Sequence, residues 1–284
     1  MFFKGFETQI QRKEDLMLAY LEILRPFNGL MSVFAVFVAA MLVNFFIPYQ
    51  LLLAFLVVFL VSGAGMVIND YFDYTIDKIN RPKRPIPSGK ISRKTALTYS
   101  MVLFLIANFI ALFLNFYMFV LVVFNTIVSI VYSWKLKKIL LVGNFVVSWL
   151  VASIFIFGSL FRGITATILI LFLIAFSSNT GREIAKSIED IKGDVKRKVN
   201  SLPIVANRYF AGWIAAIFIL FAIIFSPLPY IFGLLTVKYI YLVILADIVF
   251  AFSCFTTFIS PDKSQKMMKI AMFIALIAFL IGTI

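Results

Sequence analysis

A chain of 284 residues that is 63% hydrophobic, with a mean hydropathy of +1.04, is too apolar for a soluble protein and indicates a membrane protein with several spans. The net charge of +13 would suggest nucleic-acid binding in a soluble protein, but the bias of Lys and Arg toward cytoplasmic loops explains it without nucleic acid. One cysteine and no histidine exclude a disulfide framework, a Cys or His metal site and His acid–base catalysis.

The predicted elements begin with residues 1–25, where charged and apolar residues alternate as in an amphipathic helix at the membrane interface. Apolar segments follow, each near the ~20 residues that cross a bilayer. There are nine of them: 27–47, 49–70, 95–114, 116–134, 139–161, 164–182, 204–226, 237–260 and 267–284. The sequence therefore predicts an all-α, polytopic membrane protein in which residues 1–284 form one transmembrane domain.

The distribution of charge orients these spans. If the N-terminus is inside and the spans alternate, 24 of the 26 Lys and Arg residues fall inside, and only Arg162 and Lys238 fall outside. This partition predicts a cell-membrane protein with a cytoplasmic N-terminus. It also places the two acidic segments described next, and any active site they form, on the cytoplasmic side.

The second span ends in the first acidic segment, residues 69–77. Asp70, Asp73 and Asp77 are spaced i, i+3 and i+7, which is one face of a helix. Carboxylates on one face repel each other, and a divalent metal among them would relieve the repulsion. The alternative is a solvated helix end, although ionisable groups at membrane depth are usually functional. A basic, proline-containing loop at 78–94 follows.

Residues 182–198 form the second acidic segment. Glu183, Asp190 and Asp194 are spaced i, i+7 and i+11 and share a helical face, with Lys186 one turn before Asp190. Two acidic faces embedded in Lys and Arg suggest one compound site, in which carboxylates hold Mg²⁺ and cations hold the phosphates that Mg²⁺ bridges. Asp247 lies deep within a later span, where it either faces a polar cavity or hydrogen-bonds a neighbouring helix.

These residue types suit a diphosphate leaving group. Mg²⁺, Arg and Lys together neutralise the charge that builds on a departing diphosphate. The membrane setting indicates that the rest of the substrate is hydrophobic, and an allylic isoprenyl diphosphate meets both demands. Its ionisation leaves a carbocation that aromatic faces can stabilise, and an acceptor with an aromatic carbon or a hydroxyl would capture it.

Five motifs, in the order of the chain, resemble those of the UbiA-type intramembrane prenyltransferases. They are Arg25-Pro26-Phe27-Asn28, Asn69-Asp70-x-x-Asp73-x-x-x-Asp77, Arg81-Pro82-Lys83-Arg84-Pro85-Ile86-Pro87-Ser88-Gly89, Tyr132-Ser133-Trp134-Lys135-Leu136-Lys137, and Asp190-x-x-x-Asp194 continuing to Ser201-Leu202-Pro203. The resemblance extends from residue 25 to about residue 205. It implies the family's all-helical bundle around a central cavity that opens to the cytoplasmic side.

By position, the resemblance also implies roles for individual residues. The expected Mg²⁺ ligands, direct or through water, are Asn69, Asp73, Asp77, Asp190 and Asp194, and Asp70 supports these catalytic carboxylates. The expected substrate-binding residues are Asn28, Arg84, Tyr132, Ser133, Lys135, Lys137, Arg182, Glu183 and Lys186. Many members carry Asp where Ser187 stands, and Glu183 could substitute for that carboxylate. The alternatives are that Arg84, Lys135 and Lys137 only fix topology, and that Tyr132 belongs to an interfacial aromatic belt.

The Arg182-Glu183-Ile184-x-Lys186 stretch looks most like the archaeal branch of this family, which makes membrane ether lipids. That branch transfers a geranylgeranyl group from geranylgeranyl diphosphate to geranylgeranylglyceryl phosphate. The expected partners are thus an isoprenyl diphosphate, a lipid-like acceptor and the bilayer, with Mg²⁺ as cofactor. The acceptor's phosphate would favour extra cations such as Arg182, Lys186 or Lys83.

Three alternatives remain open. One is an aromatic-acceptor prenyltransferase of quinone or haem synthesis, which would share the donor chemistry. Another is an ion-coupled transporter, although the carboxylates cluster with cations at one membrane face instead of at the midplane, where transporter sites lie. The third is a structural scaffold, which leaves both acidic segments unexplained.

Overall fold

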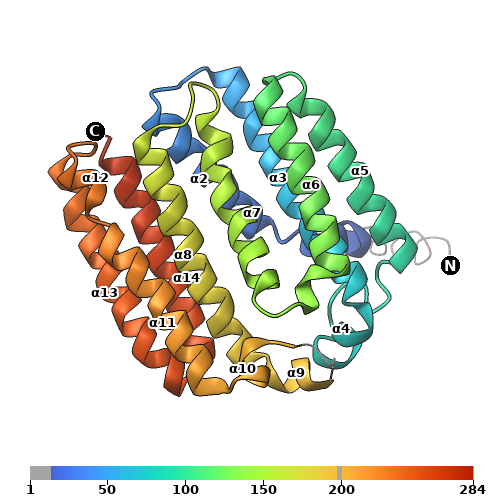
Figure 1. The fold of residues 1–284 in the computed structure, drawn as a ribbon. Helices are drawn as coiled ribbons and strands as arrows, with labels where there is room; N and C mark the ends of the chain where they lie inside the picture. Colours follow the sequence, from blue (N-terminus) through green and yellow to red (C-terminus); the bar gives the residue numbers. More distant parts are fainter. Residues whose placement is uncertain (1–13, 197–199, 284) are drawn as a thin grey trace. The chain divides into compact units, whose positions relative to one another are not determined.

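The computed structural model describes residues 14–196 and 200–283, and all the regular structure in these two ranges is helical (Figure 1). Within them, eight helices are long and apolar enough to cross a membrane, or nine if the bent pair Glu14–Leu24 and Pro26–Leu42 is one span. This confirms the prediction of an all-α, polytopic membrane protein.

Each long helix matches one of the predicted spans. These helices are α2 (Pro26–Leu42), α3 (Pro48–Phe72), α5 (Arg93–Ala111), α6 (Phe116–Trp134), α7 (Val142–Ser159), α8 (Ala166–Glu189), α11 (Arg208–Phe225), α13 (Val237–Ile259) and α14 (Pro261–Ile281). Short helices connect some of them: α4 (Tyr74–Asn80), η1 (Leu136–Lys138), α9 (Ile191–Lys196), α10 (Leu202–Val205) and α12 (Leu228–Ile231).

The chain forms two compact units. The first runs to Val33 and includes Leu53–Trp134, and the second comprises Phe34–Leu52 and Lys135–Ile284. The two acidic segments, at the end of α3 and at the end of α8, therefore belong to different units. A single domain over residues 1–284, and a central cavity within it, stay predictions.

In the first unit, α3, α5 and α6 lie side by side (Figure 1). Ser100 of α5 donates a hydrogen bond to the carbonyl of Ala64 in α3 at 3.0 Å, and Asn108 of α5 bonds Thr126 of α6 at 3.0 Å. Lipid gives membrane helices no hydrophobic driving force to associate. They are held together instead by close packing at small residues and by hydrogen bonds such as these. These bonds hold α3 in place, so that its end can carry the first acidic segment.

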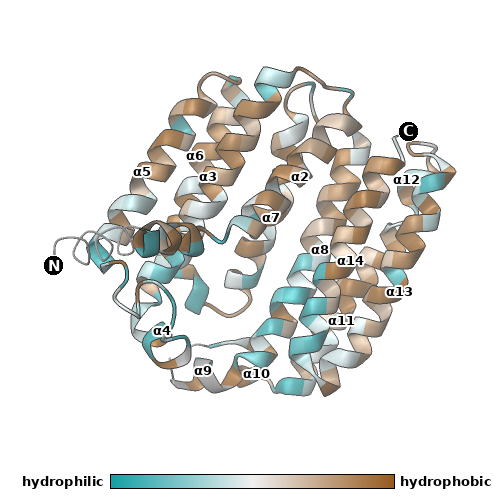
Figure 2. Cartoon of the chain, turned by 180° about the vertical axis from the view of Figure 1, so that it is seen from behind, coloured by the Kyte–Doolittle hydropathy of each residue, from teal (hydrophilic) through white to brown (hydrophobic). Residues whose placement is uncertain are grey.

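In the second unit, α8 packs against α7, α11 and α14, and α13 packs along α14. Close approach depends on glycine at two points: a Cβ at Gly181 would lie 2.8 Å from the carbonyl oxygen of Ala215, and one at Gly158 would lie 2.8 Å from that of Val36. Figure 2 shows hydrophobic residues along most of these helices, with hydrophilic residues gathered in the last turns of α8 and the first turns of α14. The polar ends of α8 and α14 are the part of this unit that can carry chemistry.

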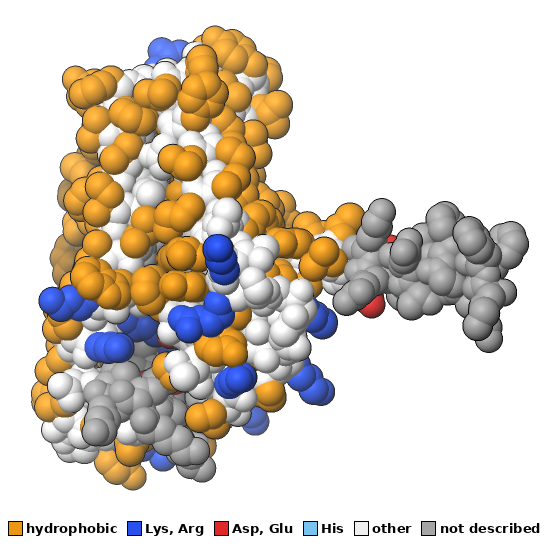
Figure 3. Space-filling model, turned by 90° about the vertical axis from the view of Figure 1, so that its right-hand side faces the viewer, with side chains coloured by type: hydrophobic (Ala, Val, Ile, Leu, Met, Phe, Trp, Pro, Cys, Tyr) orange, Lys and Arg blue, Asp and Glu red, His pale blue; other side chains and the backbone are white. Residues whose placement is uncertain are grey.

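Large hydrophobic side chains cover much of the outer surface, as expected for contact with lipid. Leu105, Phe109 and Ile127, on α5 and α6, are among the exposed ones. On the face drawn in Figure 3, hydrophobic side chains fill the upper part, whereas Lys and Arg gather below. Such an apolar exposed area would be a liability in a soluble protein, and the bilayer removes it from water.

The predicted interfacial helix lies only partly within the described residues. Helix Glu14–Leu24 is described and joins α2 with a bend of 47°, whereas residues 1–13 lie outside the described range. Its Ala19 and Ile23 are buried, and Leu16 and Leu18 are exposed. Contact of this helix with the membrane interface stays a prediction.

Asp247 of α13 accepts a hydrogen bond from the hydroxyl of Ser226 at 2.6 Å. Ser226 follows the last residue of α11, and its carbonyl accepts a bond from the buried Tyr239 hydroxyl at 2.6 Å. Of the two alternatives for Asp247, the structure thus shows the hydrogen bond to a neighbouring helix. The three residues fix the end of α11 against α13.

Candidate functional site

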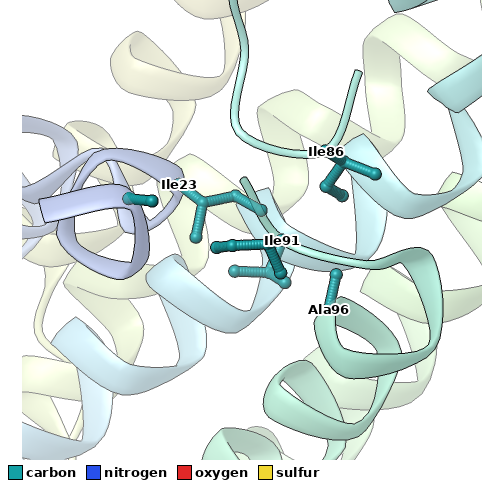
Figure 4. Close-up of a cluster of buried hydrophobic side chains, with 6 residues drawn as sticks. Ile23, Ile86, Ile91 and Ala96 are labelled. Atoms are coloured by element: carbon teal, nitrogen blue, oxygen red, sulfur yellow. The ribbon is translucent and has the colours of Figure 1, made fainter. Parts of the chain in front are cut away.

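A hydrophobic cluster positions the charged residues of the first unit (Figure 4). Its buried members come from four segments and are Ala19, Ile23, Val67, Ile86, Ile91 and Ala96. Ile23 lies two residues before Arg25, Val67 lies three before Asp70, and Ile86 lies two after Arg84. Packing these three side chains together therefore brings the two arginines to Asp70.

The loop that carries Arg84 is folded on itself. The Ser88 N–H donates to the carbonyl of Arg84 at 2.9 Å, and the Ile91 N–H donates to the carbonyl of Pro85 at 3.0 Å. Gly89 has φ of 81°, a conformation that favours glycine because it has no Cβ. These bonds make the loop a defined support for Arg84.

Arg25, Asp70, Arg84 and Asp77 form a charge network. Arg25 Nη2 lies 2.6 Å from Asp70 Oδ1, and Arg84 Nη1 lies 3.1 Å from the same oxygen and 2.5 Å from Asp77 Oδ2. Asp70 and Asp77 are only 2% and 3% exposed. Buried carboxylates need paired cations, so the positive charge expected among these carboxylates comes at least partly from Arg25 and Arg84.

Asp73 lies at a break between two helices. α3 ends at Phe72 and α4 begins at Tyr74, and Asp73 has φ of −80° and ψ of 0°. Its N–H donates to the carbonyl of Asn69, and the Asp77 N–H donates to the carbonyl of Asp73, both at 2.9 Å. The side-chain amide of Asn69 donates to Asp73 Oδ2 at 3.2 Å. The break sets Asp73 and Asn69 beside each other as a pair of oxygen-bearing side chains.

Asp190 repeats this arrangement in the second unit. It lies between α8 and α9 with φ of −82° and ψ of 1°. Its N–H donates to the carbonyl of Lys186 at 3.0 Å, and the Asp194 N–H donates to the carbonyl of Asp190 at 2.9 Å. Both predicted acidic faces are thus interrupted at an aspartate instead of following one continuous helix. At each break, the aspartate is joined by a backbone hydrogen bond to a second aspartate four residues later.

A group of cations surrounds Glu183. Arg182 Nη1 lies 2.8 Å from Glu183 Oε1, and Lys186 Nζ lies 3.5 Å from Oε2. Lys137 also interacts electrostatically with this carboxylate. Glu183 therefore interacts with three of the predicted substrate-binding cations. The sequence suggested that Glu183 replaces the carboxylate that is absent at Ser187, and the structure shows it paired with cations.

The remaining predicted residues are Ser133, Lys135, Tyr132 and Asn28. The Ser133 hydroxyl donates to the carbonyl of Ser129 at 3.0 Å and is buried, whereas Lys135 is exposed and Tyr132 is half-buried. Asn28, half-buried in α2, accepts a bond at its carbonyl from Ser32 at 3.1 Å. The roles predicted for these four residues stay predictions.

The predicted site residues divide between the two units. The first unit contains Asn28, Asn69, Asp70, Asp73, Asp77, Arg84, Tyr132 and Ser133. The second contains Lys135, Lys137, Arg182, Glu183, Lys186, Asp190 and Asp194. One compound site built from both sets stays a prediction.

The donor set of each unit fits Mg²⁺, which prefers oxygen ligands and binds through one or two carboxylates together with substrate phosphates. Asp73 and Asp194 are buried carboxylates, and Asn69 adds an amide oxygen beside Asp73. In residues 14–196 and 200–283 no three acidic side chains converge on a point where they could hold a metal by themselves. The fit is therefore to a metal that also binds phosphate oxygens.

Two contacts were missed by the sequence reasoning. Arg25 was read only as part of the entry to the first span, yet it is a direct partner of Asp70. Its sequence signal is its place directly before Pro26, because proline disfavours a helical conformation in the preceding residue. In the structure Arg25 adopts φ of 51°, and strained backbone often marks functional sites. Gln265 of α14 accepts a bond from Arg182 Nη2 at 3.2 Å and had no sequence signal, because 83 residues separate the two.

Comparison with known proteins finds relatives that match nearly the whole chain. The profile of the UbiA prenyltransferase family matches residues 30–277. Digeranylgeranylglyceryl phosphate synthase from Methanosarcina mazei is 43% identical in an alignment that covers 93% of this chain and 97% of that protein.

Two solved structures share the fold. One concerns digeranylgeranylglyceryl phosphate synthase in membranes, with a TM-score of 0.78 and 36% identity over 94% of this chain and 98% of that one. The other is a UbiA homolog from Archaeoglobus fulgidus bound to GPP and Mg²⁺, with a TM-score of 0.70 and 19% identity over 92% of this chain and 99% of that one. The second likeness, at its low identity, concerns the fold alone.

Proposed function

The chain belongs to the UbiA prenyltransferase family, and from this we propose that it transfers a geranylgeranyl group from geranylgeranyl diphosphate to geranylgeranylglyceryl phosphate. The product is a glycerol phosphate with two ether-linked chains, as in archaeal membranes. The observation that carries the proposal is the 43% identity, over nearly the whole chain, to a digeranylgeranylglyceryl phosphate synthase.

The reaction exchanges one C–O bond for another. The bond between C1 of the geranylgeranyl chain and the diphosphate breaks, and the diphosphate leaves with the electron pair. The acceptor's hydroxyl oxygen then forms the ether bond to C1. With no histidine in the chain, the hydroxyl proton passes to a carboxylate or to a diphosphate oxygen.

The proposed Mg²⁺-binding residues are Asn69, Asp73, Asp77, Asp190 and Asp194. When bound, Mg²⁺ neutralises charge on the departing diphosphate. Asp70 supports this set by holding Arg25 and Arg84. The burial of Asp73 and Asp194 and the amide of Asn69 beside Asp73 support the assignment.

Arg84, Lys135, Lys137 and Lys186 are the proposed contacts to the diphosphate, with Tyr132 and Ser133 beside it and Asn28 near the reacting carbon. Arg84 reaches both of its carboxylates through one nitrogen, Nη1, so among the residues that the structure describes its other N–H groups are left for phosphate oxygens. Glu183 holds Lys186 and Lys137 in one group and thus prepares them for an anion. A fixed group of cations binds a developing negative charge without reorganising.

The protein is a multi-pass membrane protein, and we place its N-terminus and its active site on the cytoplasmic side. The support is the distribution of charge, since only Arg162 and Lys238 fall on the opposite side when the spans alternate.

The test is a turnover assay in detergent with Mg²⁺ and radiolabelled geranylgeranyl diphosphate. Geranylgeranylglyceryl phosphate and 4-hydroxybenzoate are offered separately as acceptors. We expect label to enter the glycerol lipid alone. Label in the aromatic acid would make the chain an aromatic-acceptor prenyltransferase, and transfer to neither acceptor would refute the proposed reaction.

A further inference from the structure

We propose that Lys269 and Gln265 of α14, together with Arg182 of α8, form the subsite that binds the phosphate of the acceptor lipid. This inference rests on the proposed function and assigns a role to two residues that the family motifs do not include. All three residues belong to the second unit.

A chain of hydrogen bonds connects the polar ends of α8 and α14. Arg182 Nη2 donates to Gln265 Oε1 at 3.2 Å, and Gln265 Nε2 donates to Glu189 Oε2 at 3.3 Å. Because Gln265 bonds to both a cation and a carboxylate, its amide orientation is fixed from both sides. This chain of bonds holds α14 at a defined position beside the Arg182 side chain.

Arg182 has a donor left over. Its Nη1 is bonded to Glu183 and its Nη2 to Gln265, but within the described part of the chain its Nε is buried and donates to no protein atom. A buried N–H without a partner costs free energy. The planar guanidinium offers its N–H groups in a fork that matches phosphate oxygens, so an incoming phosphate satisfies this donor.

Lys269 adds a second cation at the same depth. It follows Gln265 by four residues, hence one turn of α14 on the same face. It lies eight residues, or about 12 Å, from the start of α14, and Arg182 lies seven residues, or about 10 Å, from the end of α8. The two are close enough for their charges to interact.

Arg182 is paired with Glu183, and Lys269 adds a second positive charge close to it inside the span of a membrane protein, which favours the binding of a further anion there. A phosphate monoester carries between one and two negative charges near neutral pH and three acceptor oxygens, which suits this pair. The donor diphosphate and the acceptor phosphate are the two anions that the reaction supplies. Lys186 and Lys137 are grouped around Glu183, the carboxylate partner of Arg182, and we assign this group to the diphosphate. The α14 side of Arg182 is then left for the acceptor.

The test separates the two anions by their KM values. Lys269→Met keeps the length of the side chain and removes its charge. We expect it to raise the KM for geranylgeranylglyceryl phosphate about 10- to 100-fold, the loss expected for one charge-assisted hydrogen bond, with the KM for geranylgeranyl diphosphate unchanged. Lys269→Arg should restore most of the affinity. An equal rise in both KM values, or no rise in either, would overturn the subsite.

Lys266→Met is the matched control, because Lys266 lies on the same helix, is 67% exposed and is paired with Asp262. It should leave both KM values unchanged, and a rise for the acceptor in this variant as well would overturn the assignment to Lys269. Geranylgeranylglycerol, which lacks the phosphate, supplies a second control. Wild type should prefer the phosphorylated acceptor strongly, and Lys269→Met should lose most of that preference.

The wild-type assay keeps failure of this subsite distinct from failure of the proposed function. If wild type does not alkylate geranylgeranylglyceryl phosphate at all, the proposed reaction is wrong. The acceptor lipid is then also not the molecule whose phosphate the subsite binds. If wild type does so and Lys269→Met retains the wild-type acceptor KM, only the subsite is wrong. Size-exclusion elution and thermal unfolding in detergent establish that each variant is folded.

Discussion

Asp70 accepts hydrogen bonds from two arginines that come from different parts of the chain, one before α2 and one in the loop before α5. A carboxylate that is 2% exposed loses its hydration, so its ionised form depends on these two partners. The charges in this network balance one another. Removing one charged residue leaves a buried charge without its partner, whereas removing an oppositely charged pair does not.

This balance makes Arg25→Met and Asp70→Asn testable as a pair. Arg25→Met should destabilise the protein by about 3 kcal/mol, because Asp70 then keeps only Arg84. Adding Asp70→Asn to Arg25→Met should recover more than half of that loss. Thermal unfolding in detergent measures both, with Lys94→Met as the control that removes an exposed cation. Strictly additive losses would show that Arg25 and Asp70 are not coupled.

A second prediction at this scale concerns Asp73. Asp73→Asn keeps the shape of the side chain and should retain the folded state, but it should lower kcat at least ~100-fold, because the charge that neutralises the metal is lost. Asp194→Asn should behave in the same way. Asp262→Asn is the control, since Asp262 is an exposed carboxylate on α14. Retention of most of the activity by either site variant would remove that residue from the Mg²⁺ site.

At the residue scale, the sequence placed Asp70 and Asp77 on one face, but it did not predict which residues balance their charge. The spacing of Asp70 and Asp77 suggested a shared face, and in the structure both contact Arg84. Arg25 could not be found by spacing, because 45 residues lie between it and Asp70. Contacts between distant segments depend on packing, which no local pattern records.

At the scale of elements, α8 and α14 extend beyond the predicted spans at ends where charged side chains pair along the helix. The span predicted to end at Arg182 continues as α8 to Glu189, because Glu183 pairs with Arg182 and with Lys186 one turn on. α14 begins at Pro261, six residues before the prediction, because Pro suits the first turn and Asp262 pairs with Lys266. Hydropathy alone marks where the apolar stretch ends and not where the helix ends.

The loop before α5 provides the element-scale prediction. Ile91→Ala removes a buried side chain from the cluster that holds Arg84 and Arg25, and should destabilise the protein by about 2–4 kcal/mol. Because the same loop carries Arg84, the KM for the diphosphate donor should rise as well. Thermal unfolding and steady-state kinetics in detergent measure the two effects.

Ile79→Ala is the control for this experiment. Ile79 lies on α4 in the same unit and is 67% exposed, so its truncation leaves no cavity. If Ile91→Ala and Ile79→Ala cost the same stability, the cluster does not support the loop.

At the scale of the whole molecule, hydropathy predicted the class of fold and its spans, which the structure confirms, whereas the orientation that charge predicts stays a prediction. The number of spans follows from the length that a bilayer requires, which leaves little freedom once the apolar segments are recognised. The division into two units could not be predicted in the same way, because each unit combines segments from distant parts of the chain.

Orientation is the whole-molecule prediction. Cys254 is the only cysteine, so Cys254→Ser provides a background for single cysteines placed at exposed loop positions. A membrane-impermeant maleimide applied to intact cells should label Arg162→Cys and should not label Lys263→Cys until the membrane is opened. Labelling of Lys263→Cys in intact cells would contradict the cytoplasmic placement of the site.

The pairing of Arg25 with Asp70 also sets an order of events during biosynthesis. Arg25 leaves the ribosome 45 residues before its partner, which is about 2–9 s at ordinary rates of translation. During that interval the arginine has no carboxylate from α3 to meet and must remain in contact with water at the membrane surface. The start of α2 can therefore reach its final position only after α3 has been synthesised, and the Arg25–Asp70 contact forms only at that stage.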